Sequence, residues 1–213
     1  MVSCKSTLVI AIGCQLLANS VSAAKMCTYS TYKWNSNSRS AVDYTRIQKP
    51  YSELKEYEID ADTGCSVCEQ DQVEINLKGV KSFKVCRILS ESIKHTLMEA
   101  IDKGMPIDEI VGYRVGMTRG DIDEQGNRTC FSNHSYGIAI DINPDRNGLY
   151  DHCISYSPEC RLIKGGAWMP ETDNRSLTEN SIVVQGLERI GMKWGGKIAG
   201  KQKDFMHFSP TGY

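Results

Sequence analysis

The chain has 213 residues, of which 40% are hydrophobic and 24% charged, and its 25 Lys and Arg against 26 Asp and Glu give a formal net charge of -1. This composition is typical of a globular protein and excludes one that binds nucleic acid through a basic surface, because such binding needs many cationic contacts to phosphates. The length favours one domain, large enough for a hydrophobic core.

The N-terminus is typical of a secretory signal. Lys5 precedes an apolar stretch over residues 8–18, and residues 21–23 (VSA) supply a small-residue cleavage site. The stretch is shorter than the roughly 20 residues that a membrane-spanning helix needs. We therefore expect residues 1–23 to be removed and the mature protein to be exported, periplasmic or secreted, with no integral membrane segment. An uncleaved anchor and a lipid attached to Cys14 are the alternatives.

Cysteine usage agrees with export. The chain has nine cysteines, and seven of them lie beyond residue 23. Such a content favours disulfides and an oxidising compartment, although the sequence leaves the pairing open. A redox pair or half of a zinc knuckle is the alternative for the C-x-x-C at residues 65–68, but no second such motif completes it. The candidates for local disulfides are Cys153 with Cys160, and the cluster of Cys65, Cys68 and Cys86.

Residues 24–70 are polar and rich in Tyr, Ser and Asn, with little periodicity. We expect an extended N-terminal segment that lies over the main domain, which then comprises residues 71–213. In this domain, residues 71–85 alternate apolar and polar side chains around a Lys-Gly pair, which predicts a β-hairpin. Apolar residues in the segment 86–103 recur at helical spacing before Gly104, so we predict an amphipathic helix that ends there.

The second half of the chain continues this mixed order. Residues 110–118 predict a strand, and the Gly- and Asp-rich segment after them predicts a loop. A further strand is expected over residues 136–142 and a helix over residues 177–190, with a long loop between them. The fold class that we predict is α+β, with a small antiparallel sheet and flanking helices.

Two of the four histidines could form a metal site. In the strand predicted over residues 136–142, the residues that share a face with Asp141 are small, so its carboxylate can point into a pocket. His134 lies in the turn before that strand, and a buried carboxylate needs a cation or hydrogen-bond donors. With His207 these residues would give a catalytic zinc site with a fourth position for water, and Asp204 would be free to act as general base. The alternative is that both histidines are ordinary hydrogen-bonded residues.

The motifs S-x-H-x-x-G-x-A-x-D-I-N-P at residues 132–144, W-G-G at 194–196 and D-x-x-H-F at 204–208 strongly resemble one enzyme family. These are the zinc metallopeptidases of bacterial cell-wall peptides, which include the D-alanyl-D-alanine carboxypeptidases and dipeptidases and the L-alanyl-D-glutamate endopeptidases. The resemblance covers about residues 112–210. It implies a zinc domain of this type, and the motif layout is closer to the endopeptidase and carboxypeptidase-like branch than to the dipeptidases.

The resemblance also implies roles for individual residues. Zn2+ would be bound by His134, Asp141 and His207, Asp204 would be the catalytic base, and the substrate would be a peptidoglycan stem peptide. The family often uses Glu where Asp204 stands.

Relatives carry an arginine on the preceding strand, which stabilises the oxyanion of the reaction. An ungapped alignment places Gly116 at this position. Arg114, two residues earlier on the same strand face, is the replacement that we prefer, and Arg119 is the second candidate. A surface position is the alternative for each of them.

Four further residues have weaker assignments. Ser132 is expected either to contact the substrate or to hold the turn at His134. Trp194 could form a wall of the substrate cleft or pack in the core. We expect His95 and His152 to lie outside the metal site.

These observations predict an exported, monomeric zinc peptidase that cleaves amide bonds in peptidoglycan stem peptides. The rival is a catalytically inactive, zinc-stabilised extracellular binding module of the same fold, as in the amino-terminal domain of hedgehog proteins. Asp204 favours the peptidase and Gly116 favours the module. A disulfide-stabilised domain without metal is the third alternative, whereas a serine hydrolase is disfavoured because the G-x-S-x-G motif is missing. The bond that is cleaved and the origin of the cell wall stay open.

Overall fold

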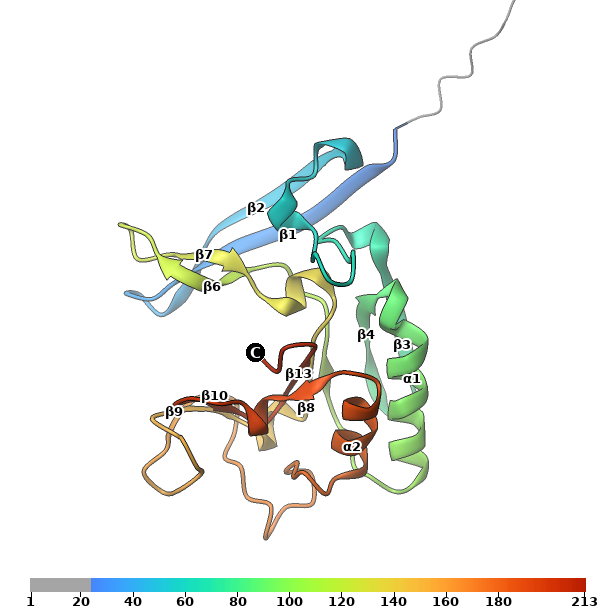
Figure 1. Cartoon of the computed structure of the whole chain (residues 1–213), viewed down its shortest axis with the longest axis vertical. Helices are drawn as coiled ribbons and strands as arrows, with labels where there is room; N and C mark the ends of the chain where they lie inside the picture. The colour runs from blue at the N-terminus through green and yellow to red at the C-terminus, as the bar shows by residue number, and fades with distance from the viewer. Residues whose placement is uncertain (1–23) are drawn as a thin grey trace, which may run out of the picture.

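The computed structural model describes residues 24–213, so the predicted signal lies outside the described residues. Within this range two α-helices combine with four small sheets (Figure 1), which confirms a mixed α and β fold. The sheets are antiparallel except for one parallel pairing, between β1 (Met26–Asn35) and β6 (Met117–Ile122). None of the helices in this range has the length and apolar character needed to cross a membrane.

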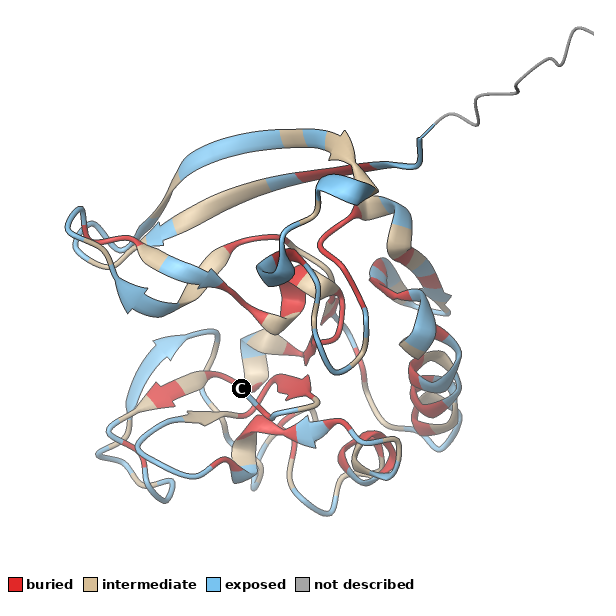
Figure 2. Ribbon diagram, turned by 45° about the horizontal axis from the view of Figure 1, so that its top comes forward, coloured by how far each residue is buried: buried red, intermediate tan, exposed pale blue. Residues whose placement is uncertain are grey.

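The N-terminal segment forms strands that the sequence analysis did not predict. β1 pairs with β2 (Ser40–Pro50) in a long antiparallel hairpin, and the sheet continues through β6 to β7 (Arg128–Phe131) in the order β2-β1-β6-β7. Exposed and partly buried residues dominate along β2 (Figure 2), so the segment lacks the clean alternation that identifies a half-buried strand. The boundary proposed after residue 70 stays a prediction.

The predicted hairpin and first helix are confirmed. β3 (Gln72–Leu77) pairs with β4 (Val80–Cys86) across a turn in which Gly79 has φ 81°, and α1 (Arg87–Asp102) follows directly. Gly104 has φ 85°, a conformation that glycine adopts without steric cost. Local sequence therefore determines this part of the fold.

The main core lies between the helices and a central sheet of order β11-β13-β8-β5. This sheet consists of β11 (Lys193–Trp194), β13 (His207–Ser209), β8 (Ile140–Ile142) and β5 (Ile110–Val111). The helix predicted over residues 177–190 is shorter: α2 spans Ile182–Arg189, because Thr178 and Ser181 form a hydrogen-bonded turn before it. Buried residues of the core include Ile93, Leu97, Ile140, Ile142, Leu187 and Phe208.

The strand predicted over residues 110–118 is wrong in one respect, because the structure divides it between two sheets. β5 belongs to the central sheet and β6 to the N-terminal sheet, and residues 112–116 cross from one to the other. The loop predicted after it is the β6–β7 hairpin, whose turn is closed by Asp123. The next predicted strand is reduced to β8, because Asn133–Tyr136 form a 3-10 helix, η4. The crossing segment and η4 both adjoin the site described below.

A third sheet carries the remaining strands near the site. Its order is β10 (Arg161–Lys164), β9 (Leu149–Asp151), β12 (Lys203–Asp204), all antiparallel. The loop between β9 and β10 is closed by the predicted disulfide Cys153–Cys160.

Two more disulfides anchor the N-terminal segment, and together they indicate an oxidising compartment. Cys27 is bonded to Cys68, and Cys65 to Cys86, so the C-x-x-C cysteines have different partners and are neither a redox pair nor a zinc knuckle. Cys130 is the free cysteine among the described residues.

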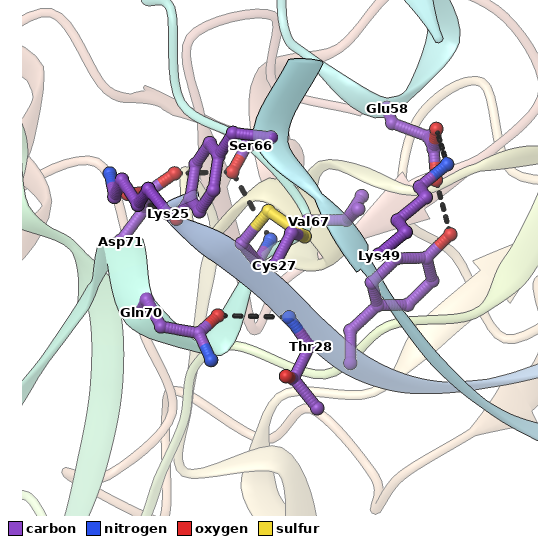
Figure 3. The surroundings of a disulfide bond; sticks show 12 residues. Lys25, Cys27, Thr28, Lys49, Glu58, Ser66, Val67, Gln70 and Asp71 are labelled. Atoms are coloured by element: carbon purple, nitrogen blue, oxygen red, sulfur yellow. Dashed lines mark hydrogen bonds and ion pairs between the residues drawn. A yellow bond between two sulfur atoms is a disulfide. The ribbon is translucent and has the colours of Figure 1, made fainter. Parts of the chain in front are cut away.

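Polar contacts surround the Cys27–Cys68 disulfide (Figure 3). Buried Glu58 pairs with Lys49 at 2.5 Å and accepts a hydrogen bond from Tyr29. The backbone N–H of Thr28 donates to the side chain of Gln70.

Loop length predicts how much two of these disulfides stabilise the fold. Cys27–Cys68 joins residues 41 apart in sequence and Cys153–Cys160 joins residues 7 apart. From chain entropy, removing the first pair by Cys→Ala substitutions should lower the free energy of unfolding by about 4 kcal/mol and removing the second by about 2.5 kcal/mol. Urea denaturation of the two double variants measures both losses. Equal losses would contradict the entropic account.

Candidate metal centre

His134 lies in η4, and its imidazole is buried. Its Nδ1 is 2.8 Å from the carbonyl oxygen of Gly112 in the crossing segment, and its Nε2 is 3.1 Å from Asp141 Oδ1. A carbonyl only accepts hydrogen bonds, so Nδ1 carries the proton of the neutral ring and Nε2 presents a lone pair. This is the tautomer of a histidine that binds a metal through Nε2.

Asp141 and His207 face one another across two central strands. β8 and β13 pair so that Asp141 stands opposite His207, and His207 Nδ1 is 2.9 Å from Asp141 Oδ1. Both side chains are buried, like that of His134, and the three potential ligand atoms all lie within 4.8 Å of one another. The structure thus brings together the three residues that the motifs predicted as metal ligands.

Each imidazole of this cluster has one ring nitrogen that receives no hydrogen bond from the described residues, and a bound cation would supply the missing partner. The lone pair of His134 Nε2 faces a carboxylate oxygen, and His207 Nε2 is buried without a hydrogen-bond partner in residues 24–213. Burial lowers the pKa of His134, which favours the neutral ring that metal binding requires. Burial opposes ionisation of Asp141, but its two imidazole neighbours, His134 and His207, hold the pKa of this carboxyl well below the usual range. Two imidazoles and one carboxylate are a donor set that Zn2+ prefers, so these residues fit the ion.

Asp204 lies beside this cluster at the end of β12. Its Oδ1 is buried and has no hydrogen-bond partner in the described part of the chain. Burial raises the pKa of Asp204 to about 6; the charge of Asp141 adds to this rise, and His207 and Arg119 oppose it. A carboxylate with a pKa near neutrality can accept and return a proton, which a general base must do.

The W-G-G segment packs against Asp204. A Cβ on Gly195 would lie 2.4 Å from the carbonyl oxygen of Asp204, so only glycine permits this approach. Trp194 is 5% exposed, and its indole N–H donates to the carbonyl of Phe205 at 2.8 Å. These are core contacts that fix the backbone next to Asp204. The substrate contact suggested for Trp194 stays a prediction.

The two candidate arginines lie differently. Arg114 Nη2 is 3.6 Å from Asp141 Oδ2, so its guanidinium adjoins the cluster. Arg119 Cζ stands 5.8 Å from the ring centre of Tyr213. A Cβ on Gly116 would lie 2.6 Å from the ring of Tyr32, which comes from β1, so a side chain at the aligned position of the arginine would require this ring to move.

The weaker candidates are also placed by the structure. Ser132 helps to hold the turn through its carbonyl, which accepts from Ser135 N–H at 2.8 Å, while its buried hydroxyl has no partner in residues 24–213. His95 lies on α1, and the side chain of His152 is 68% exposed. Neither belongs to the cluster. Sequence reasoning missed the Gly112 carbonyl and Tyr213, because neither a backbone acceptor nor a distant aromatic ring leaves a local pattern.

Metal binding tests the cluster directly. We expect stoichiometric zinc in the purified protein, loss of most of it in His134→Ala and His207→Ala, and retention in Asp204→Asn, because Asp204 is not among the three ligands. Elemental analysis after dialysis measures the content, and His95→Ala is the matched control. Full zinc occupancy in His207→Ala would contradict the assignment.

The pKa of Asp204 predicts a pH dependence of stability in the metal-free protein. Because its folded pKa of about 6 exceeds the unfolded value, the folded state binds the proton more tightly. The stability that this tighter proton binding contributes is present at pH 4 and is lost as the pH rises through 6. Asp204→Asn, which cannot ionise, should therefore raise the free energy of unfolding at pH 8 by about 1 to 3 kcal/mol and have little effect at pH 4.

Urea denaturation with chelator present, at both pH values, gives the two differences. Asp121→Asn, an exposed position on β6, controls for loss of a carboxylate. A stability change in Asp204→Asn that is the same at both pH values would be evidence against the raised pKa.

Comparison with known proteins agrees with the motifs. Residues 125–210 match a family model described as D-alanyl-D-alanine carboxypeptidase. The matched segment includes His134, Asp141, Asp204 and His207. Searches among curated proteins and among solved structures found no match. Over residues 125–210 the chain therefore matches the D-alanyl-D-alanine carboxypeptidase family, and the resemblance drawn from its motifs is confirmed.

Proposed function

We propose that this protein is a zinc-dependent peptidase that hydrolyses amide bonds in peptidoglycan stem peptides, with D-Ala-D-Ala carboxypeptidase-like or L-Ala-D-Glu endopeptidase-like specificity. The observation that carries the proposal is Asp204 beside the His-Asp-His cluster: the residue is partly buried, its Oδ1 is buried without a partner in residues 24–213, and its pKa is about 6. A site that used zinc only for stability would not need this residue. The family match over residues 125–210 supports peptidase chemistry.

Each residue of the site has its own role in the proposed hydrolysis. His134, Asp141 and His207 would hold Zn2+, which when bound polarises a carbonyl and lowers the pKa of water. Asp204 takes the proton of the attacking water and returns it to the leaving amine. Arg114, which is 30% exposed and reaches the cluster, stabilises the negative charge that develops on the carbonyl oxygen.

The finer assignments of fold and location belong to the same proposal. A zinc domain of the D-Ala-D-Ala peptidase and hedgehog type is supported by the ligands on β8 and β13 and by the family match. Export to the periplasm or the outside is supported by the three disulfides. A monomeric state and removal of residues 1–23 remain predictions.

One observation favours an inactive binding module instead. Position 116, where relatives carry an arginine, is a glycine in this chain, and the ring of Tyr32 occupies the space next to it. In that case zinc would stabilise a surface that binds a partner without cleaving it. The position of Arg114 favours the peptidase instead. It lies two residues before Gly116 and brings a guanidinium to Asp141 in the cluster.

Digestion of purified muropeptides decides between these functions. The zinc-loaded protein should release new fragments, detected by mass spectrometry, that disappear with chelator. Asp204→Asn should keep its zinc and lower kcat by about 100-fold or more, because it removes the general base. Asp121→Asn is the control. Zinc without cleavage would favour the binding module, and absence of both would refute the proposal.

A further inference from the structure

Arg119 is a half-buried cation that lacks an anionic partner. It lies on β6, and no ion pair or side-chain hydrogen bond in residues 24–213 involves its guanidinium, whereas Arg114 pairs with Asp141. Burial lowers the pKa of Arg119, and the charges of Asp204 and Asp141 oppose this effect. Holding a desolvated cation without a partner costs free energy, so the side chain is suited to an anion that arrives with a ligand.

The ring of Tyr213 lies next to this guanidinium. Arg119 Cζ lies 5.8 Å from the centre of the Tyr213 ring, within the range of a cation–π contact. The tyrosine is itself fixed at both ends: its hydroxyl donates to the carbonyl of Ala199, and its own carbonyl accepts from Asn133, the neighbour of His134, and from Ser209. Tyr213 therefore connects the turn that carries His134 with the segment that follows W-G-G. Figure 1 shows this end of the chain between the N-terminal sheet and the central sheet.

This arrangement leaves the hydrogen-bonding edge of Arg119 available. The N–H groups of Arg119 have no hydrogen-bond partner in residues 24–213, so they can bind a carboxylate with two parallel hydrogen bonds. Asp204 is needed as the base and lies beyond ion-pair distance, since no ion pair joins it to Arg119. Stem peptides carry free carboxylates at the C-terminus and on their glutamate residue, so the expected substrate supplies the missing anion.

We propose that Arg119 binds a free carboxylate of the stem peptide near the scissile bond, and that Tyr213 is the positioning residue for its guanidinium. This inference rests on the proposed peptidase function. The two arginines then have different roles: Arg114 stabilises the oxyanion, and Arg119 selects substrates by their charge. Arg119 therefore contributes to binding, and its loss raises KM more than it lowers kcat.

Calorimetric binding to the zinc-loaded Asp204→Asn protein, which binds without turnover, tests the proposal. The probes are a synthetic stem pentapeptide and two versions in which either the glutamate carboxylate or the C-terminal carboxylate is an amide. With Arg119 present, one of the amides should bind at least about tenfold more weakly than the acid, the size expected for a charge-assisted contact. In Arg119→Gln this difference should disappear, and Arg119→Lys should retain part of it.

The tyrosine is tested in the same background. Tyr213→Phe keeps the ring and should keep most of the preference for the acid, whereas Tyr213→Leu should lose most of it. Arg46→Gln, on β2 of the same sheet, is the control for loss of one positive charge. A preference that persists in Arg119→Gln, or equal binding of all three peptides when Arg119 is present, would overturn the inference.

Hydrolysis by the unsubstituted protein is measured in parallel with the same peptides. If the acid preference depends on Arg119 but no peptide is cleaved, the peptidase proposal fails and the carboxylate site stands. Cleavage with no effect of Arg119 on binding or KM refutes only the carboxylate site.

Discussion

The buried carboxylate of Asp141 is the constraint on which the rest of the structure depends. It lies in the central sheet, and His134, His207 and Arg114 approach it from three different segments of the chain. A charge at this depth is tolerated only if cationic or polar groups surround it. The positions of η4, β13 and the crossing segment are therefore linked, because each delivers one partner to the same carboxylate.

Backbone groups position this site as much as side chains do. The Gly112 carbonyl fixes the ring of His134, and the pairing of β8 with β13 places His207 opposite Asp141. Gly195 lets the chain approach the backbone of Asp204 closely. Because these contacts involve rigid elements and not flexible side chains, the proposed ligands and the proposed base are preorganised.

The N-terminal segment is structurally continuous with the site. Cys86, which is disulfide-bonded to Cys65, donates its backbone N–H to the carbonyl of Gly137 at 2.8 Å, directly after the turn that carries His134. Tyr32 of β1 packs over Gly116 in the crossing segment. The hairpin and its disulfides thus support the turn and the crossing segment that hold His134. This explains how a polar segment with little periodicity can be part of the working structure.

Local patterns in the sequence determined the β3–β4 hairpin, helix α1 and the identity of the proposed metal ligands, because turn glycines, helical periodicity and motif spacing are local properties. Tertiary structure decided the rest. The strand over residues 110–118 was divided because its two ends pair with different sheets, and β1 and β2 formed although their residues alternate poorly. The space beside Gly116 is occupied by Tyr32, which lies far away in sequence and close in space. Strand pairing and side-chain packing depend on residues far apart in sequence, so local sequence patterns do not predict them.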